Sequence, residues 1–224
     1  MENYDGDMEL YNTVCEFVIK ECDGRDESHG FNHMKTVAMI AIDILEQEID
    51  RMQITDNEKI NKYIEMVIIV ALLHDVADHK YDKDGKIKKN IINFLNKTVP
   101  DDAELITDII DRISYSKENK AIKNNEKLDW EEKLGQDGLF IRNIVSDADK
   151  LEAIGKKGID RCVEYTKVID GNNLSEIEIN KKVVEHAKEK LLRLKDEFIR
   201  TPSGKEMAEP LHNEMILELN NLIL

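Results

Sequence analysis

The stretch VALLHDVADHKYD, residues 70–82, begins as a buried helix and ends in acids and imidazoles. The titratable side chains that follow the apolar run are His74, Asp75, Asp78, His79 and Asp82. Buried charge is costly unless it is paired or bound to a metal. The stretch therefore predicts a cation site at the end of a core helix, with further ligands elsewhere in the chain.

The composition limits the classes of partner. The chain has 224 residues, enough for one domain with a substantial core. Its net charge of −15 argues against nucleic-acid polymers and anionic membranes, but it leaves a small phosphorylated ligand in a local pocket open. The longest apolar run, Met66–Leu73, is too short to span a bilayer.

The chain shows no secretory features. The N-terminus MENYDGDMEL is acidic and polar, unlike a signal peptide. The three cysteines form no CxxC pair, which predicts reduced thiols and a cytoplasmic protein.

Apolar spacing predicts an all-α protein of about ten helices. Charged residues make up 35% of the chain and aromatic residues 5%, as in helical proteins with solvated outer faces. The run 61–73 is predicted as the central helix, and another helix is expected to start at Pro100. Residues 115–140 are polar and are predicted as a long surface loop that leaves room for one small hairpin.

Three segments carry candidate metal ligands. His29 and His33 are four residues apart in SHGFNHMKTV, so they share a face if the helix has begun by Ser28. His74 and Asp75 end the buried helix. VSDADKLEAIGKKGIDR, residues 145–161, sets Asp147 and Asp149 among apolar residues. Imidazole and carboxylate ligands suit a divalent ion, and the ordered set is a stronger signal than any one residue.

These segments resemble the HD-domain metal-dependent phosphohydrolases, in their compact single-domain bacterial branch. The resemblance rests on SHGFNHMKTV, ALLHDVADHKY, IVSDADKLEAIGKKGIDR and the C-terminal LLRLKDEFIRTPSGKEMAEPLH. It implies an HD-domain helical bundle in which residues 1–224 form one domain. The motif core then covers about 25–165, and residues 166–224 form a helical tail.

The resemblance also implies a ligand set of His33, His74, Asp75 and Asp149 for one divalent ion: Mn, Fe, Co, Ni, Mg or Zn. Asp149 is preferred because it stands directly before Lys150 and Leu151, as family ligands do before a basic and an apolar residue. Asp147 then supports the site or acts as an acid at a helix N-terminus.

Other residues match positions near the family's substrate. Asp78 is a candidate for proton transfer, with a capping role as the alternative. His29 is the second candidate and is expected to face the substrate. The candidates for substrate contacts are Lys80, Lys150, Arg161 and His79. For the first three, a surface salt bridge is the alternative.

The implied activity is hydrolysis of a phosphoester or phosphoanhydride in a small phosphorylated substrate. A nucleotide is favoured, with nucleoside triphosphate pyrophosphohydrolysis as the first expectation. The alternatives are a nucleoside monophosphatase, a cyclic-nucleotide or alarmone hydrolase, and a non-catalytic metal and nucleotide sensor. The chain departs from the common family pattern at His29-Gly30 and Thr36-Val37, which leaves the substrate more open than the metal.

Overall fold

The computed structural model describes residues 3–25, 30–170 and 174–223. All secondary structure in these ranges is helical, which confirms the predicted all-α class. The chain divides into two compact units, Met1–Ser146 and Asp147–Leu224. Within the described ranges no helix is both long enough and apolar enough to cross a membrane.

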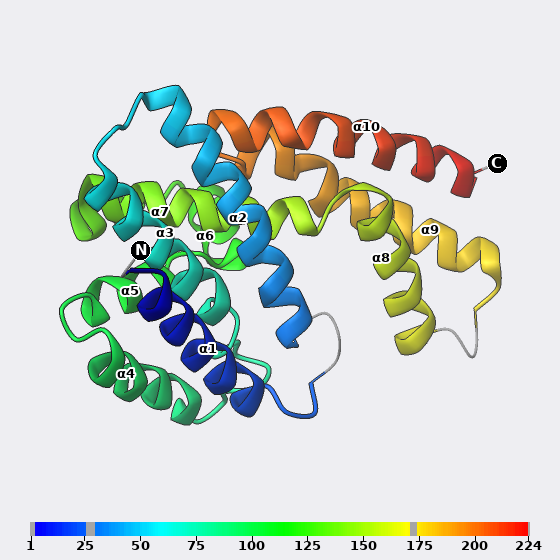
Figure 1. Cartoon of the computed structure of the whole chain (residues 1–224). Helices are drawn as coiled ribbons and strands as arrows, with labels where there is room; N and C mark the ends of the chain where they lie inside the picture. The colour runs from blue at the N-terminus through cyan, green and yellow to red at the C-terminus, as the bar shows by residue number, and fades with distance from the viewer. Residues whose placement is uncertain (1–2, 26–29, 171–173, 224) are drawn as a thin grey trace. The chain divides into compact units, whose positions relative to one another are not determined.

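The first unit is built around helix α3. Its helices are α1 (Asn3–Glu21), α2 (Phe31–Met52), α3 (Asn57–Leu73), α4 (Lys86–Thr98), α5 (Ala103–Ile110), α6 (Tyr115–Lys123) and most of α7 (Trp130–Glu152). Helix α3 lies among α1, α2 and α5 and contacts all three (Figure 1). Its residues 69–73 are buried without interruption. The Asp56 carboxylate caps its start by accepting from the backbone N–H groups of Glu58 and Lys59. The central helix was therefore predicted correctly.

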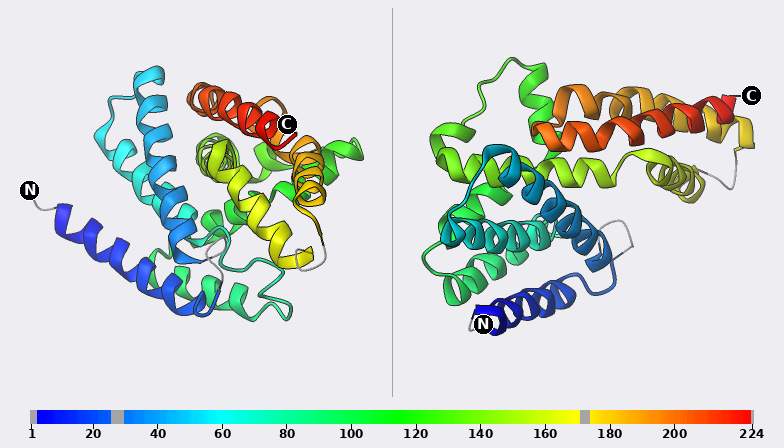
Figure 2. Two further views of the ribbon diagram at one scale, coloured as in Figure 1. Left: turned by 90° about the vertical axis from the view of Figure 1, so that its right-hand side faces the viewer. Right: turned by 45° about the horizontal axis from the view of Figure 1, so that its top comes forward.

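The second unit contains the end of α7 and the C-terminal helices. These are α8 (Gly155–Asp170), α9 (Glu176–His186), the π-helical segments η1 (Ala187–Leu191) and η2 (Leu194–Phe198), and α10 (Pro202–Ile223). Helix α10 runs alongside α9 and also contacts α8 and η2 (Figure 2). Apolar residues at helical spacing are buried along α9, η1 and η2: Val184, Ala187, Leu191, Leu194 and Phe198.

The segment 115–140 is not a long loop, and the part of the chain described contains no hairpin there. It forms α6 and the first part of α7. The Ser114 side chain caps α6. Glu118 of α6 is buried and its Oε2 lies 2.9 Å from Nη2 of Arg142, while the Arg142 guanidinium lies 3.5 Å from the centre of the Trp130 ring. A buried ion pair thus anchors a helix that has few apolar residues.

Two smaller expectations are also corrected. Pro100 lies in a turn, and α5 begins only at Ala103. Helix α7 is kinked at Gly135, whose φ of 62° and ψ of −173° are non-helical and suit glycine. The three cysteines are free, as predicted.

Candidate metal centre

His33 lies in the first turn of α2. The helix begins at Phe31, with Gly30 as an extended N-cap residue, and the backbone N–H of His33 donates to Gly30 O at 3.1 Å. The buried face of α2 includes Met34, Val37 and Ala38, so His33, which is itself buried, points to the interior of the first unit. His29 lies outside the described residues.

His74 directly follows α3 and is held in one orientation. Its Nδ1 lies 2.8 Å from the carbonyl oxygen of Ala71, which can only accept. Nδ1 therefore carries a proton, and in the neutral imidazole this leaves the Nε2 lone pair for a ligand. The centres of the His33 and His74 rings are 5.4 Å apart, with 57° between the ring planes. The structure thus brings together two of the predicted ligands, from α2 and from the end of α3.

Asp75 and Asp78 lie in the turn that follows. The N–H of Val76 donates to Leu73 O, and the N–H of Asp78 donates to Asp75 O, each at 3.2 Å. Asp78 Oδ1 accepts from the backbone N–H of Lys80 at 2.9 Å, so the carboxylate binds a backbone group of its own turn. His79 Nδ1 lies 3.3 Å from Asp78 Oδ2, and the His79 side chain is 86% exposed.

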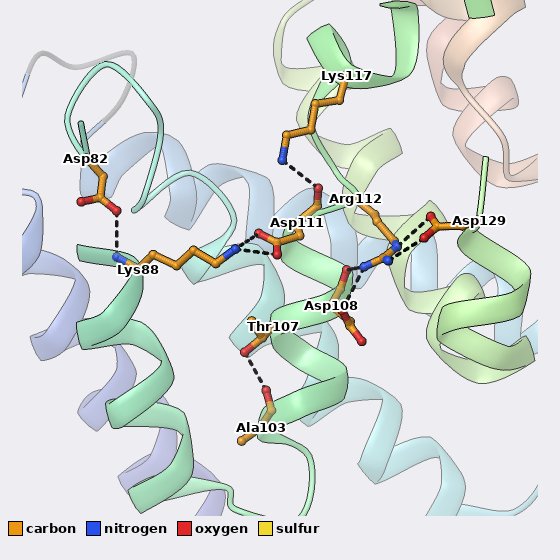
Figure 3. Close-up of polar contacts among 9 residues, drawn as sticks. All are labelled: Asp82, Lys88, Ala103, Thr107, Asp108, Asp111, Arg112, Lys117 and Asp129. Atoms are coloured by element: carbon orange, nitrogen blue, oxygen red, sulfur yellow. Dashed lines mark hydrogen bonds and ion pairs between the residues drawn. The ribbon is translucent and has the colours of Figure 1, made fainter. Parts of the chain in front are cut away.

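Asp82 and the charged residues beyond it stabilise helices. The Asp82 carboxylate accepts from the backbone N–H groups of Ile87 and Lys88 at 2.8 and 2.9 Å, which caps the start of α4. The Lys88 ammonium in turn pairs with Asp111 at 2.6 Å, as Figure 3 shows. Arg112, beside Asp111, pairs with Asp129 at 2.8 Å. These contacts fix the ends of α4 and α5.

Asp147 belongs to the second unit and is fully buried. Its Oδ2 accepts from the backbone N–H and the hydroxyl of Thr201, both at 2.7 Å, and its Oδ1 accepts from the N–H of Arg200 at 2.9 Å. Burial raises the pKa of the Asp147 carboxyl, while these donors act in the opposite direction. Gly204 leaves the space for this contact, since a Cβ there would lie 2.8 Å from Asp147 Oδ2. Asp147 therefore supports the start of α10.

The position of Asp147 corrects one detail of the sequence analysis. It was expected near the start of its helix, but α7 ends at Glu152, so Asp147 and Asp149 lie in its last turns. The proposed role of an acid at a helix N-terminus is nevertheless found, because Asp147 serves the N-terminus of α10 instead of its own helix. Asp149 is half-buried on α7.

The cations expected to contact substrate lie in different surroundings. Lys80 is exposed, whereas Lys150 is buried. The Arg161 guanidinium pairs with both carboxylate oxygens of Glu152, and Lys157 Nζ lies 2.9 Å from the same carboxylate. Glu152 is 4% exposed, so its charge is balanced by two cations. For Arg161 the ion pair considered as an alternative is present.

Comparisons with known proteins identify the fold. Bacillus subtilis YpgQ, in a crystal structure with ADP, is 23% identical with a TM-score of 0.66; the match covers 96% of this chain and 94% of YpgQ. An HD-superfamily hydrolase from Bacillus thuringiensis is 22% identical with a TM-score of 0.60, over 97% of this chain and 96% of that protein. The chain has the HD-domain fold. No family model and no curated protein matches the sequence.

The HD-domain fold agrees with the resemblance inferred from the motifs. A Lactobacillus plantarum protein is also similar in structure, with 23% identity, a TM-score of 0.67, and coverage of 95% of this chain and 94% of that one. Sequence reasoning missed two residues beside the motifs, Arg25 and Glu152. Arg25 is a single basic residue in ECDGRDESHG, and its partners lie 50 and 51 residues away. Glu152, within DKLEAIG, was taken as part of a motif without a role of its own.

Proposed function

We propose that this protein is a metal-dependent phosphohydrolase that acts on a small phosphorylated substrate, a nucleotide in the first instance. The observation that carries the proposal is the His33–His74 pair. Two imidazoles from different helices lie 5.4 Å apart, and one has its Nδ1 committed to the carbonyl oxygen of Ala71. Metal-binding histidines are commonly oriented in this way by a second hydrogen bond.

The proposed ligands are His33, His74, Asp75 and Asp149. His33, His74 and Asp149 supply two imidazoles and a carboxylate, a group of donors that could hold a metal ion. This donor set suits Mn, Fe, Co, Ni, Mg or Zn, and it contains no thiolate. A divalent ion bound there would lower the pKa of a bound water and polarise a phosphoryl oxygen.

The chain's own residues would bind phosphate and move the proton. Asp78 is the proposed acid or base because it follows the His74–Asp75 turn and its carboxylate is held by the N–H of Lys80. His29 is the other proposed proton carrier. Lys80, His79, Lys150 and Arg161 are the proposed contacts to the substrate, and Arg161 would have to share its charge with Glu152.

A nucleotide is favoured for two reasons. YpgQ, which has the same fold, has been crystallised with ADP. The chain's net charge of −15 also disfavours extended polyanions, while a local group of cations can still bind one phosphate chain. Cleavage of a nucleoside triphosphate to a monophosphate and pyrophosphate is therefore the first reaction to test.

The test is a substrate screen with defined metals. The purified full chain, stripped and reloaded with Mn, Co, Mg or Ni, is incubated with nucleoside mono-, di- and triphosphates and with cyclic nucleotides. Phosphorus NMR then separates pyrophosphate from phosphate as the product. We expect turnover that requires metal and is lost in His74→Ala. If the protein binds metal but cleaves no member of the panel, the proposed enzymatic activity is contradicted and a non-catalytic sensor is favoured.

A further inference from the structure

Arg25 lies in the connection between α1 and α2 and reaches the turn that contains His74 and Asp75. Its Nη1 donates to the carbonyl oxygen of Asp75 at 3.2 Å, and its Nη2 donates to that of Val76 at 2.5 Å. Nη2 also lies 3.4 Å from the carbonyl oxygen of Glu21, the last residue of α1. One planar guanidinium thus binds two successive carbonyls of the turn and the end of a second helix.

The guanidinium is a charged donor to these carbonyls, one of which, Asp75 O, also accepts from the backbone N–H of Asp78. The last carbonyls of a helix have no partner within the helix, and they carry its partial negative charge. Asp75 O and Val76 O follow α3 directly, and Glu21 O ends α1, so the positive guanidinium lies at the C-terminal ends of both helices. Hydrogen bonds from a charged donor are stronger than neutral ones. A lysine could not bind both carbonyls in the same planar geometry.

Arg25 also holds the far end of the same turn. Its guanidinium carbon lies 4.3 Å from the centre of the Tyr81 ring, a cation–π contact. Between Asp75 and Tyr81 the chain makes further turn hydrogen bonds, including the N–H of Tyr81 to Asp78 O at 2.9 Å. The side chain therefore contacts the turn at its beginning, through the peptides of Asp75 and Val76, and at its end, through Tyr81.

We propose that Arg25 is a positioning residue for the metal centre. By fixing the backbone at Asp75 and Val76, it sets the direction in which the Asp75 carboxylate leaves the end of α3. It would not touch the substrate or the ion. This inference rests on the proposed function, because it assumes that His74 and Asp75 bind a metal.

The test compares metal affinity with stability in three variants of the full chain. Arg25→Met removes the charge and the hydrogen bonds, and Arg25→Lys keeps the charge but not the paired geometry. The matched control is Arg112→Met, since Arg112 also makes paired hydrogen bonds in the first unit, to Asp129 and Asp108, away from this turn. Affinity for Co and Mn is measured by titration calorimetry, and the thermal midpoint is measured on metal-free protein by circular dichroism.

We expect Arg25→Met to weaken metal binding by about 10–100-fold, the usual cost of losing a group that orients a ligand. Arg25→Lys should lose affinity too, with a metal-free thermal midpoint close to wild type. Arg112→Met should lower the thermal midpoint and leave the affinity unchanged. Wild-type affinity in both Arg25 variants would overturn this inference alone, as would an equal loss in Arg112→Met. A wild-type chain that binds neither ion would overturn the proposed function.

Discussion

The buried ion pair between α6 and α7 offers the most direct test of the fold. Glu118 and Arg142 have side chains that are fully buried, and Glu118 Oε2 lies 2.9 Å from Arg142 Nη2. Removing one member of such a pair costs about 3–5 kcal/mol, because the other charge stays buried. Arg142 also donates to Arg112 O and Asn143 Oδ1, so the lower end, about 3 kcal/mol, is expected for Glu118→Ala.

A double variant distinguishes the cost of leaving one charge buried from the cost of changing the helix itself. Replacing Glu118 by Leu and Arg142 by Met removes both charges and keeps most of the volume. Its cost should fall well below the sum of the single variants, since replacing a buried pair by apolar residues is often nearly neutral. The hydrogen bond from Arg142 to Arg112 O is lost in Arg142→Met and in the double variant but not in Glu118→Ala, and its loss adds about 1 kcal/mol.

The assay is urea unfolding followed by two probes. Far-ultraviolet circular dichroism reports all helices, and the fluorescence of Trp130, the only tryptophan, reports the ring beneath the Arg142 guanidinium. Coincident transitions allow one free energy of unfolding to be compared among variants. If Glu118→Ala costs less than about 1 kcal/mol, as at an exposed ion pair, the assignment of α6 as a helix anchored by buried charge is refuted.

Three further predictions follow from the site and from the second unit. His74→Ala and Asp75→Ala should lose bound metal, measured by plasma mass spectrometry, but keep a helical circular dichroism spectrum. The control His79→Ala, at an exposed side chain, should keep the metal. Asp149→Asn should lose metal and turnover, whereas Asp147→Asn should keep the metal and lose about 1.5–3 kcal/mol of stability in urea; the opposite pattern reverses the assignment. Burial lowers the pKa of His186 below 6.5, so the unfolded chain takes up the proton first on acidification. Stability should therefore fall below pH 6.5, and less in His186→Gln; an equal fall in that variant removes His186 as the cause.

The helices that bury apolar residues could be predicted from the sequence, and the helix that buries charge could not. Helix α3 is apolar on most sides, and residues 184–198 repeat apolar positions at helical spacing. In α6 the buried residues are Glu118 and Ala121. The partner of Glu118 lies 24 residues further along the chain, so no local pattern marks the helix.

The same distinction applies at the site. His33 and His74 were candidate ligands as imidazoles, and the family resemblance placed both in the ligand set; the structure brings their rings together. The hydrogen bonds of Arg25 to Asp75 and Val76, and those of Asp147 to Arg200 and Thr201, join chain segments about 50 residues apart, and most of these partners are backbone groups. A backbone carbonyl or N–H has no sequence signature, so the supporting residues of a site are harder to predict than its ligands.

The carboxylates of this acidic chain can be distinguished by the hydrogen bonds that their oxygens accept. Asp82 and Asp147 each bind two or more backbone N–H groups at the start of a helix, where negative charge is favoured. A carboxylate used in this way has fewer lone pairs left for an ion, and its position is fixed by the helix start that it caps. Asp149 lies two residues beyond Asp147 and its carboxylate is among the groups suited to a metal. We therefore expect the two aspartates of the motif DAD to differ in function: Asp147 binds the backbone N–H groups of Arg200 and Thr201, and Asp149 is the proposed metal ligand.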